Sequence, residues 1–163
     1  MREDAPTALD LPPVDPWPEH TQAYFDLCAE TQGLVPNVLR AYAFNIEQLD
    51  AFTAMYNALM LSESGLSKLE REMIAVVVSS ENRCYYCQVA HGQAVRELSG
   101  DPELGERMVM NYRTADLSAR QRRMLDFVVL LTRESASVSE DLSLIHISEP
   151  TRPVGISRMP SSA

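Results

Sequence analysis

The stretch EMIAVVVSSENRCYYCQVAHG, from Glu72 to Gly92, carries the pattern on which the fold and function of this chain depend. It holds two of the three cysteines, Cys84 and Cys87, in a CxxC arrangement, and His91 follows four residues after the second. If the cysteines open a helix, the i, i+3 and i, i+4 spacings place both thiols and the imidazole on one face. The pattern therefore predicts a helical site made of two thiols and a base.

The segment before the cysteines, from Leu66 to Val78, is predicted to form a helix that is apolar from Met73 onward and carries the acid Glu72 in its middle. Ser67 and Glu70 form the capping-box pattern that opens such a helix. Because Glu72 shares a face with apolar neighbours, we expect its carboxylate to be partly buried. A proton relay with His91 beside the dithiol would give this carboxylate a function.

Length and composition limit the functional classes. A chain of 163 residues suffices for one ordinary domain with a single core. The net charge of −9 and the pI of about 4.8 do not favour nucleic acid or an anionic membrane as a partner. The sequence has neither an apolar run near the ~20 residues of a membrane span nor the apolar core of a signal peptide. Three cysteines are too few for a disulfide-built secreted scaffold, so we expect a cytoplasmic protein.

Helical patterns fill most of the chain. Residues 1–18 carry half of the prolines and predict an extended arm, either docked through Trp17 or frayed. Cys28 lies on an apolar stripe, so we expect it to be a small buried hydrophobe. No segment shows sustained alternation, which predicts an all-α class. Besides the helix described above, apolar spacing and cap residues predict helices at 19–32, 36–43, 45–61, 84–98 and 118–133, and a short one opened by Asp101 and Pro102.

Two of these helices have an apolar stripe that predicts a core-facing side. The methionines Met55 and Met60 are predicted to fill the core rather than to bind a ligand. The predicted stripes comprise Leu49, Phe52, Tyr56 and Leu59 in the helix at 45–61, and Leu125, Phe127, Val128 and Leu131 in the helix at 118–133.

The last segment departs from the helical pattern. Ser139-Glu140-Asp141 resembles a helix start, but LSLIHISEPTR, at 142–152, resembles the translation of a transposase adapter from sequencing libraries. The residues after it have no periodicity either. We therefore expect the native chain to stop near Asp141, with its own C-terminal helices absent and residues 142–163 a non-native tail. His146 is accordingly left out of the predicted site. The alternative is an irregular native tail.

The central stretch and its flanks resemble a known family. Glu72, Cys84-x-x-Cys87 and His91, at these spacings, resemble the signature of the alkylhydroperoxidase D-like proteins of the carboxymuconolactone decarboxylase superfamily. The similarity covers about residues 18–135. Three segments are similar to the peroxidase-related branch: LVPNVLRAYA (34–43), ALMLSESGLSKLEREMIAVVVSS (58–80) and NRCYYCQVAHG (82–92).

The resemblance implies an all-helical, oligomeric domain at 19–141 whose dithiol acts as a peroxidase or a disulfide reductase. It implies that Glu72, Cys84, Cys87 and His91 form the proton relay and the redox pair. We expect a small hydroperoxide as substrate, an external thiol or dithiol as reductant, and neither a metal nor a bound cofactor. Alkylhydroperoxidase D has a histidine directly before the second cysteine, where this chain has Tyr86, so one relay group is missing.

Two arguments disagree about which cysteine attacks the peroxide. The helix dipole favours Cys84, which is nearer the helix start, by typically ~0.3–1 kcal/mol. Proton transfer favours Cys87, because His91 is its i+4 neighbour, and a positioned base can contribute more than the dipole does. The resemblance also implies the second cysteine, so we predict that Cys87 is peroxidatic and Cys84 resolving.

Three other functions are alternatives to peroxide reduction. A thiol–disulfide carrier without peroxidase activity would need the same dithiol. A zinc site would draw three ligands from Cys84, Cys87 and His91, and only Cys28 or His20 could complete it. A decarboxylase-like lyase follows from fold analogy alone and leaves the dithiol without a purpose.

Overall fold

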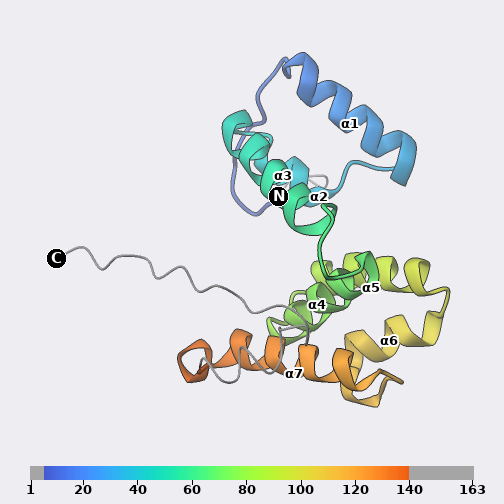
Figure 1. Cartoon of the computed structure of the whole chain (residues 1–163). Helices are drawn as coiled ribbons and strands as arrows, with labels where there is room; N and C mark the ends of the chain where they lie inside the picture. The colour runs from blue at the N-terminus through green and yellow to red at the C-terminus, as the bar shows by residue number, and fades with distance from the viewer. Residues whose placement is uncertain (1–5, 140–163) are drawn as a thin grey trace. The chain divides into compact units, whose positions relative to one another are not determined.

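The computed structural model of the chain describes residues 6–139 (Figure 1). All regular secondary structure in that range is helical, which confirms the all-α class. The chain divides into two units, Met1–Ser62 and Glu63–Ala163, so the predicted domain at 19–141 spans both. The predicted non-native tail, which includes His146, lies outside the described residues. Of the predicted helix start at 139–141, only Ser139 is described.

The first unit contains α1 (Glu19–Gln32), α2 (Asn37–Tyr42) and α3 (Ile46–Met60). Two predicted end signals are confirmed: Gly33 ends α1 in the left-handed conformation at φ 76°, and the Asn45 side chain accepts the Gln48 N–H at the start of α3. The buried core consists of Phe25, Cys28, Leu39, Ala43 and Leu49.

The proline-rich arm is docked on this unit. The Trp17 ring meets the Phe25 ring edge-on, with centroids 4.8 Å apart. Closer to the N-terminus, the Val14 N–H donates to the Ala43 carbonyl at 2.8 Å. Cys28 is buried, as predicted, and burial raises the pKa of its thiol. The docked alternative for the arm is therefore correct at these positions.

The predicted stripe of α3 is only partly buried. Leu49 is buried, whereas Tyr56, Met55 and Leu59 are 36%, 57% and 65% exposed. The prediction that Met55 fills the core is therefore wrong. Within this unit α3 packs mainly on α2, and its core contributions come from its first two turns.

The second unit is organised around α4 (Lys68–Glu81), which packs against α5 (Tyr85–Ser99), α6 (Pro102–Asn111) and α7 (Ala119–Arg133). Two short 3₁₀ helices, η1 (Tyr112–Thr114) and η2 (Ser135–Ser137), follow α6 and α7. Met73, Val76 and Val77 of α4 are almost completely buried. The other buried members of the core are Val95, Met108, Tyr112, Ala115, Met124, Leu125, Val128 and Val129.

The predicted caps of this unit are also confirmed. Ser67 and Ser118 each close a full capping box, and the Asp101 side chain caps α6 with Pro102 in its first turn. The predicted stripe of α7 is buried apart from Leu131, which is 47% exposed. None of the helices within residues 6–139 is long and apolar enough to cross a membrane.

Candidate active site

The turn between α4 and α5 fixes the position of the dithiol. The Arg83 N–H donates to the Ser80 carbonyl at 3.1 Å, and the Cys84 N–H donates to the Ser79 carbonyl at 3.0 Å. This is the hydrogen-bond pattern of a Schellman motif, which usually has glycine at its left-handed position. Here Arg83 occupies that position, at φ 54°. The Gln88 amide adds a further hydrogen bond to the Ser79 carbonyl, at 3.3 Å.

Cys84 ends this turn and begins the next helix. It is the N-cap residue of α5, where its Sγ accepts the Cys87 N–H at 3.4 Å. The two cysteines are joined by a disulfide, with their Cα atoms 5.4 Å apart. The prediction that the cysteines open a helix is therefore confirmed. The N-cap of α5 is thus also the last residue of the turn that ends α4, so no further residue separates that turn from α5.

Glu72 and His91 meet across the α4–α5 pair. The Nδ1 atom of His91 lies 2.7 Å from Oε2 of Glu72, and the side chains are 23% and 14% exposed, respectively. The expected partial burial of Glu72 is confirmed. A carboxylate only accepts hydrogen bonds, so Nδ1 donates in this contact, and in the neutral imidazole Nε2 is then the nitrogen with the free lone pair. The second ring nitrogen can then accept a proton from another group.

All four predicted site residues thus lie on α4, on α5 or in the turn that joins them. His91 follows Cys87 by one helical turn on α5, which puts the base on the face of the second cysteine. The two residues considered as further zinc ligands, His20 and Cys28, belong to the first unit. Within residues 6–139, no group of three or more His, Cys, Asp or Glu side chains is arranged to hold a metal ion.

The surface beside the dithiol is apolar and exposed. Tyr85, Tyr86 and Val89 are 81%, 42% and 49% exposed. The sequence pattern identified Tyr86 only as a departure from the family signature. It did not identify Arg83, because arginine as a residue type does not indicate a left-handed backbone. Only the position of Arg83, between two predicted helices and one residue before an N-cap, could have suggested that conformation.

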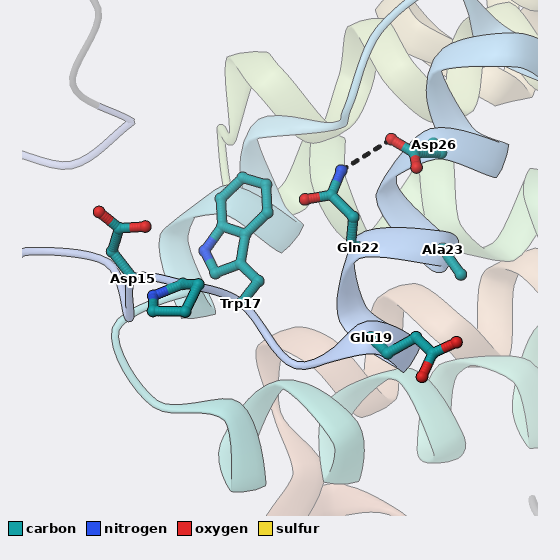
Figure 2. A pocket seen from close by; sticks show the side chains of 7 residues that line it. Asp15, Trp17, Glu19, Gln22, Ala23 and Asp26 are labelled. Carbon is teal, nitrogen blue, oxygen red and sulfur yellow. Dashed lines mark hydrogen bonds between the residues drawn. The ribbon is translucent and has the colours of Figure 1, made fainter.

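The first unit has a cavity of its own. It has a volume of about 620 Å³ and is lined by the end of the arm and the start of α1 (Figure 2). Asp15, Glu19 and Asp26 contribute three carboxylates, and its lining has no cationic side chain or cysteine. The Gln22 amide donates to Asp26 at 2.8 Å. Such a lining would repel anions, and it supplies no redox group.

Comparison with known proteins agrees with this architecture. The carboxymuconolactone decarboxylase family model matches residues 47–104, which include all four predicted site residues. No curated protein matches the chain at a significant level.

Two crystal structures are similar over most of the chain. An uncharacterized peroxidase-related protein from Silicibacter sp. TM1040 is 65% identical, with a TM-score of 0.84, over 90% of this chain and 76% of that one. An uncharacterized peroxidase-related protein from Ralstonia eutropha JMP134, described as an alkylhydroperoxidase AhpD core, is 36% identical, with a TM-score of 0.78, over 85% of this chain and 73% of that one. The chain therefore belongs to the carboxymuconolactone decarboxylase family, in its alkylhydroperoxidase D-like, peroxidase-related branch.

Proposed function

We propose that this chain reduces hydroperoxides through a dithiol–disulfide cycle of Cys84 and Cys87, with Glu72 and His91 as its proton relay. The observation that most directly supports this is the 2.7 Å contact between Glu72 on α4 and His91 on α5, the helix that the cysteines open. The peroxidase-related names of the similar proteins support the same class of reaction.

In the first step, Nε2 of His91 accepts the thiol proton of Cys87. The thiolate attacks the peroxide, so that an S–O bond forms as the O–O bond breaks. Cys87 is oxidised to a sulfenic acid, and the leaving alkoxide takes the proton from the imidazolium to become an alcohol. Glu72 holds the imidazole through Nδ1 and stabilises its charged form.

In the second step, Cys84 attacks the sulfenic sulfur of Cys87. The S–S bond forms, and hydroxide leaves with the Cys84 proton as water. This step is intramolecular, and the disulfide between the two cysteines corresponds to its product. A dithiol from outside the protein then reduces the disulfide by exchange and is itself oxidised. The cycle needs no bound metal or cofactor, and we propose that it runs in the cytoplasm.

A second candidate is thiol–disulfide exchange without peroxide reduction. The exposed Tyr85, Tyr86 and Val89 around the disulfide favour it, because a protein substrate would need an apolar surface beside the reactive pair. The chemistry would be the exchange step alone, with a protein disulfide or dithiol as the other reactant.

Peroxide consumption tests the two candidates. The purified full chain is reduced and then given hydrogen peroxide, an alkyl hydroperoxide or a protein disulfide, with a panel of dithiols as electron donors. Peroxide turnover that a Cys87→Ser variant abolishes supports the first proposal. If the chain exchanges with the protein disulfide but turns over no peroxide with any donor, peroxide reduction is rejected and thiol–disulfide exchange is favoured.

We further propose that the chain forms a homo-oligomer. Large apolar side chains are exposed on both units, among them Leu59 and Leu61 in the first and Tyr85, Leu98 and Leu131 in the second, each between 47% and 81% exposed. We expect light scattering to show association at tens of micromolar, within the ~μM–mM range in which such surfaces associate. A monomer at that concentration would contradict this.

A further inference from the structure

We propose that the second unit carries a binding site for a small organic anion in the cleft formed by the end of α4, the α6–η1 junction and the end of α7. The cleft has a volume of about 410 Å³. Three arginines line it, Arg83, Arg113 and Arg133, and they come from three separate segments of the chain. Because none of them belongs to the dithiol relay, the proposal goes beyond the proposed peroxide chemistry and does not depend on it.

The charge of the lining stands out in this protein. The chain has 23 acidic and 14 basic residues, yet the lining has three arginines against one acid, Glu81. A concave site that gathers one sign of charge attracts ligands of the opposite sign. An anion that the rest of the surface repels would therefore be favoured here.

The three guanidinium groups differ in the hydrogen bonds and ion pairs that they already make within the protein. Arg133 donates from Nε to Oε2 of Glu81. Arg113 lies over the Tyr112 ring, 4.6 Å from its centroid, and its Nη2 is 3.8 Å from Oδ1 of Asp126. That separation is too long for a direct hydrogen bond. Arg113 therefore keeps donors for a ligand.

Among the three arginines, the Arg83 guanidinium makes the fewest contacts with other side chains. Its guanidinium makes no ion pair or hydrogen bond with any side chain of residues 6–139. Its backbone is left-handed at φ 54°, a conformation that glycine adopts without the steric cost that arginine carries. The hydrogen bonds of Arg83 N–H and Cys84 N–H hold that backbone in place, so the free side chain starts from a fixed point at the cleft.

The rest of the lining indicates what else the ligand contains. Met110 belongs to the lining and is 80% exposed, so the cleft also offers a large apolar side chain to a ligand. Arginine forks match the planar pair of carboxylate oxygens and the oxygens of phosphate. The cleft also falls within the ~300–1,000 Å³ of typical ligand pockets. The geometry points to a short hydrocarbon chain that ends in a carboxylate or a phosphate.

Nuclear magnetic resonance titration of the full ¹⁵N-labelled chain tests the site. The probes are hexanoate, inorganic phosphate and, as the neutral match of the first, hexanol. We expect hexanoate to shift the backbone signals of Arg83, Arg113 and Arg133 in a saturable manner, and hexanol to bind at least tenfold more weakly. Saturable binding of phosphate instead of hexanoate, at the same residues, would support the anion site and assign it to phosphate groups.

Two variants and a control locate the binding. Arg83→Asn removes the charge while asparagine tolerates a left-handed backbone, and Arg113→Gln removes the second donor. We expect each to weaken hexanoate or phosphate binding by about tenfold, because charge-assisted hydrogen bonds are lost. Arg107→Gln is the matched control: this arginine is on α6, pairs with Glu103 at 2.8 Å and is not in the lining.

Binding that stays within twofold in both cleft variants would overturn the proposal. So would equal weakening by Arg107→Gln, since the effect would then come from net charge alone, and so would equal affinity for hexanoate and hexanol. Shifts that do not saturate with either anion would also reject the site. Peroxide turnover is read separately, so loss of that activity leaves the binding result unchanged.

Discussion

The imidazole of His91 on α5 is joined to the carboxylate of Glu72 on α4 through Nδ1 and Oε2, at 2.7 Å. This contact orients the imidazole ring and leaves Nε2 as the acceptor on the face of α5 that also carries Cys87. The helix pair therefore joins a partly buried acid on α4 to the helix that the cysteines open.

The first prediction concerns the charge of that acid. Glu72→Gln keeps the shape and can still accept from Nδ1, but it cannot stabilise an imidazolium. We expect the helical content to be retained and peroxide turnover to fall by ~10²–10⁴-fold, the usual contribution of a positioned acid–base group. Glu97→Gln, an exposed change on α5, is the control. A Glu72→Gln variant within about twofold of the parent rate contradicts the relay.

The second prediction assigns the two sulfurs. In Cys84→Ser, the new hydroxyl can cap α5 as Cys84 Sγ does, so the helix start should persist. After one equivalent of peroxide, we expect a sulfenic acid on Cys87 that dimedone traps and mass spectrometry detects. If the adduct instead appears on Cys84 in Cys87→Ser and is absent from Cys84→Ser, the resolving and peroxidatic roles are reversed.

The third prediction tests the packing of α5 on α6. A Cβ atom at Gly92 would lie 2.9 Å from Cγ2 of Val109, closer than packed carbon atoms approach. We expect Gly92→Ala to cost about 1–3 kcal/mol in overpacking, partly offset by the ~1 kcal/mol that alanine gains over glycine in a helix. Val109→Ala removes the obstructing atom, so the double variant should recover stability by more than ~0.5 kcal/mol relative to additivity. Additive effects in urea unfolding would show that the helices are not in contact there.

The fourth prediction concerns alkaline pH. Burial, and then the 2.5 Å hydrogen bond to Asp126, raise the pKa of Tyr112 above its ordinary value of 10.0. Its neutral form is therefore favoured by folding, and the contribution is complete below pH 10.0 and lost as pH rises above it. We expect Tyr112→Phe to lose stability less steeply above pH 10.0 than the parent.

Tyr85→Phe is the control for that experiment, because Tyr85 is 81% exposed. It should retain the steep loss of stability above pH 10.0 that Tyr112 gives the parent. At neutral pH, Tyr112→Phe should be less stable by about 0.5–1.5 kcal/mol, the net value of one hydrogen bond. Parallel profiles for parent and Tyr112→Phe above pH 10.0 would contradict the assignment.

Local chemistry explains why so many helix ends could be predicted. Ser67, Asn45, Asp101 and Ser118 satisfy backbone N–H groups within three residues of themselves, so the sequence alone contains both partners. The approach of Glu72 to His91 was implied by the family resemblance, because periodicity places each residue on a face of its own helix but does not fix which faces of two helices meet.

The features that escaped prediction depend on distant neighbours. The stripe of α3 is apolar, but the exposure of Leu59 depends on how many other helices cover that stripe. Periodicity along one helix gives no information about that number. The arginine cleft brings together Arg83, Arg113 and Arg133, which are 20 to 50 residues apart in the sequence. The left-handed Arg83 is contrary to local preference and depends on the turn around it.

Cys84 is both the last residue of the turn that ends α4 and the N-cap of α5. The number of residues between Glu72 and His91 therefore cannot change without moving α5 relative to α4. One residue added between Ser79 and Cys84 would break the hydrogen bond that joins them and rotate α5 by about 100° relative to α4, the angle of one helical residue. The imidazole would then face away from its carboxylate. An insertion after Ser62, between the two units, would leave this geometry intact. Lengthening the chain can therefore be tolerated between the units but not inside the helix pair that carries the dithiol.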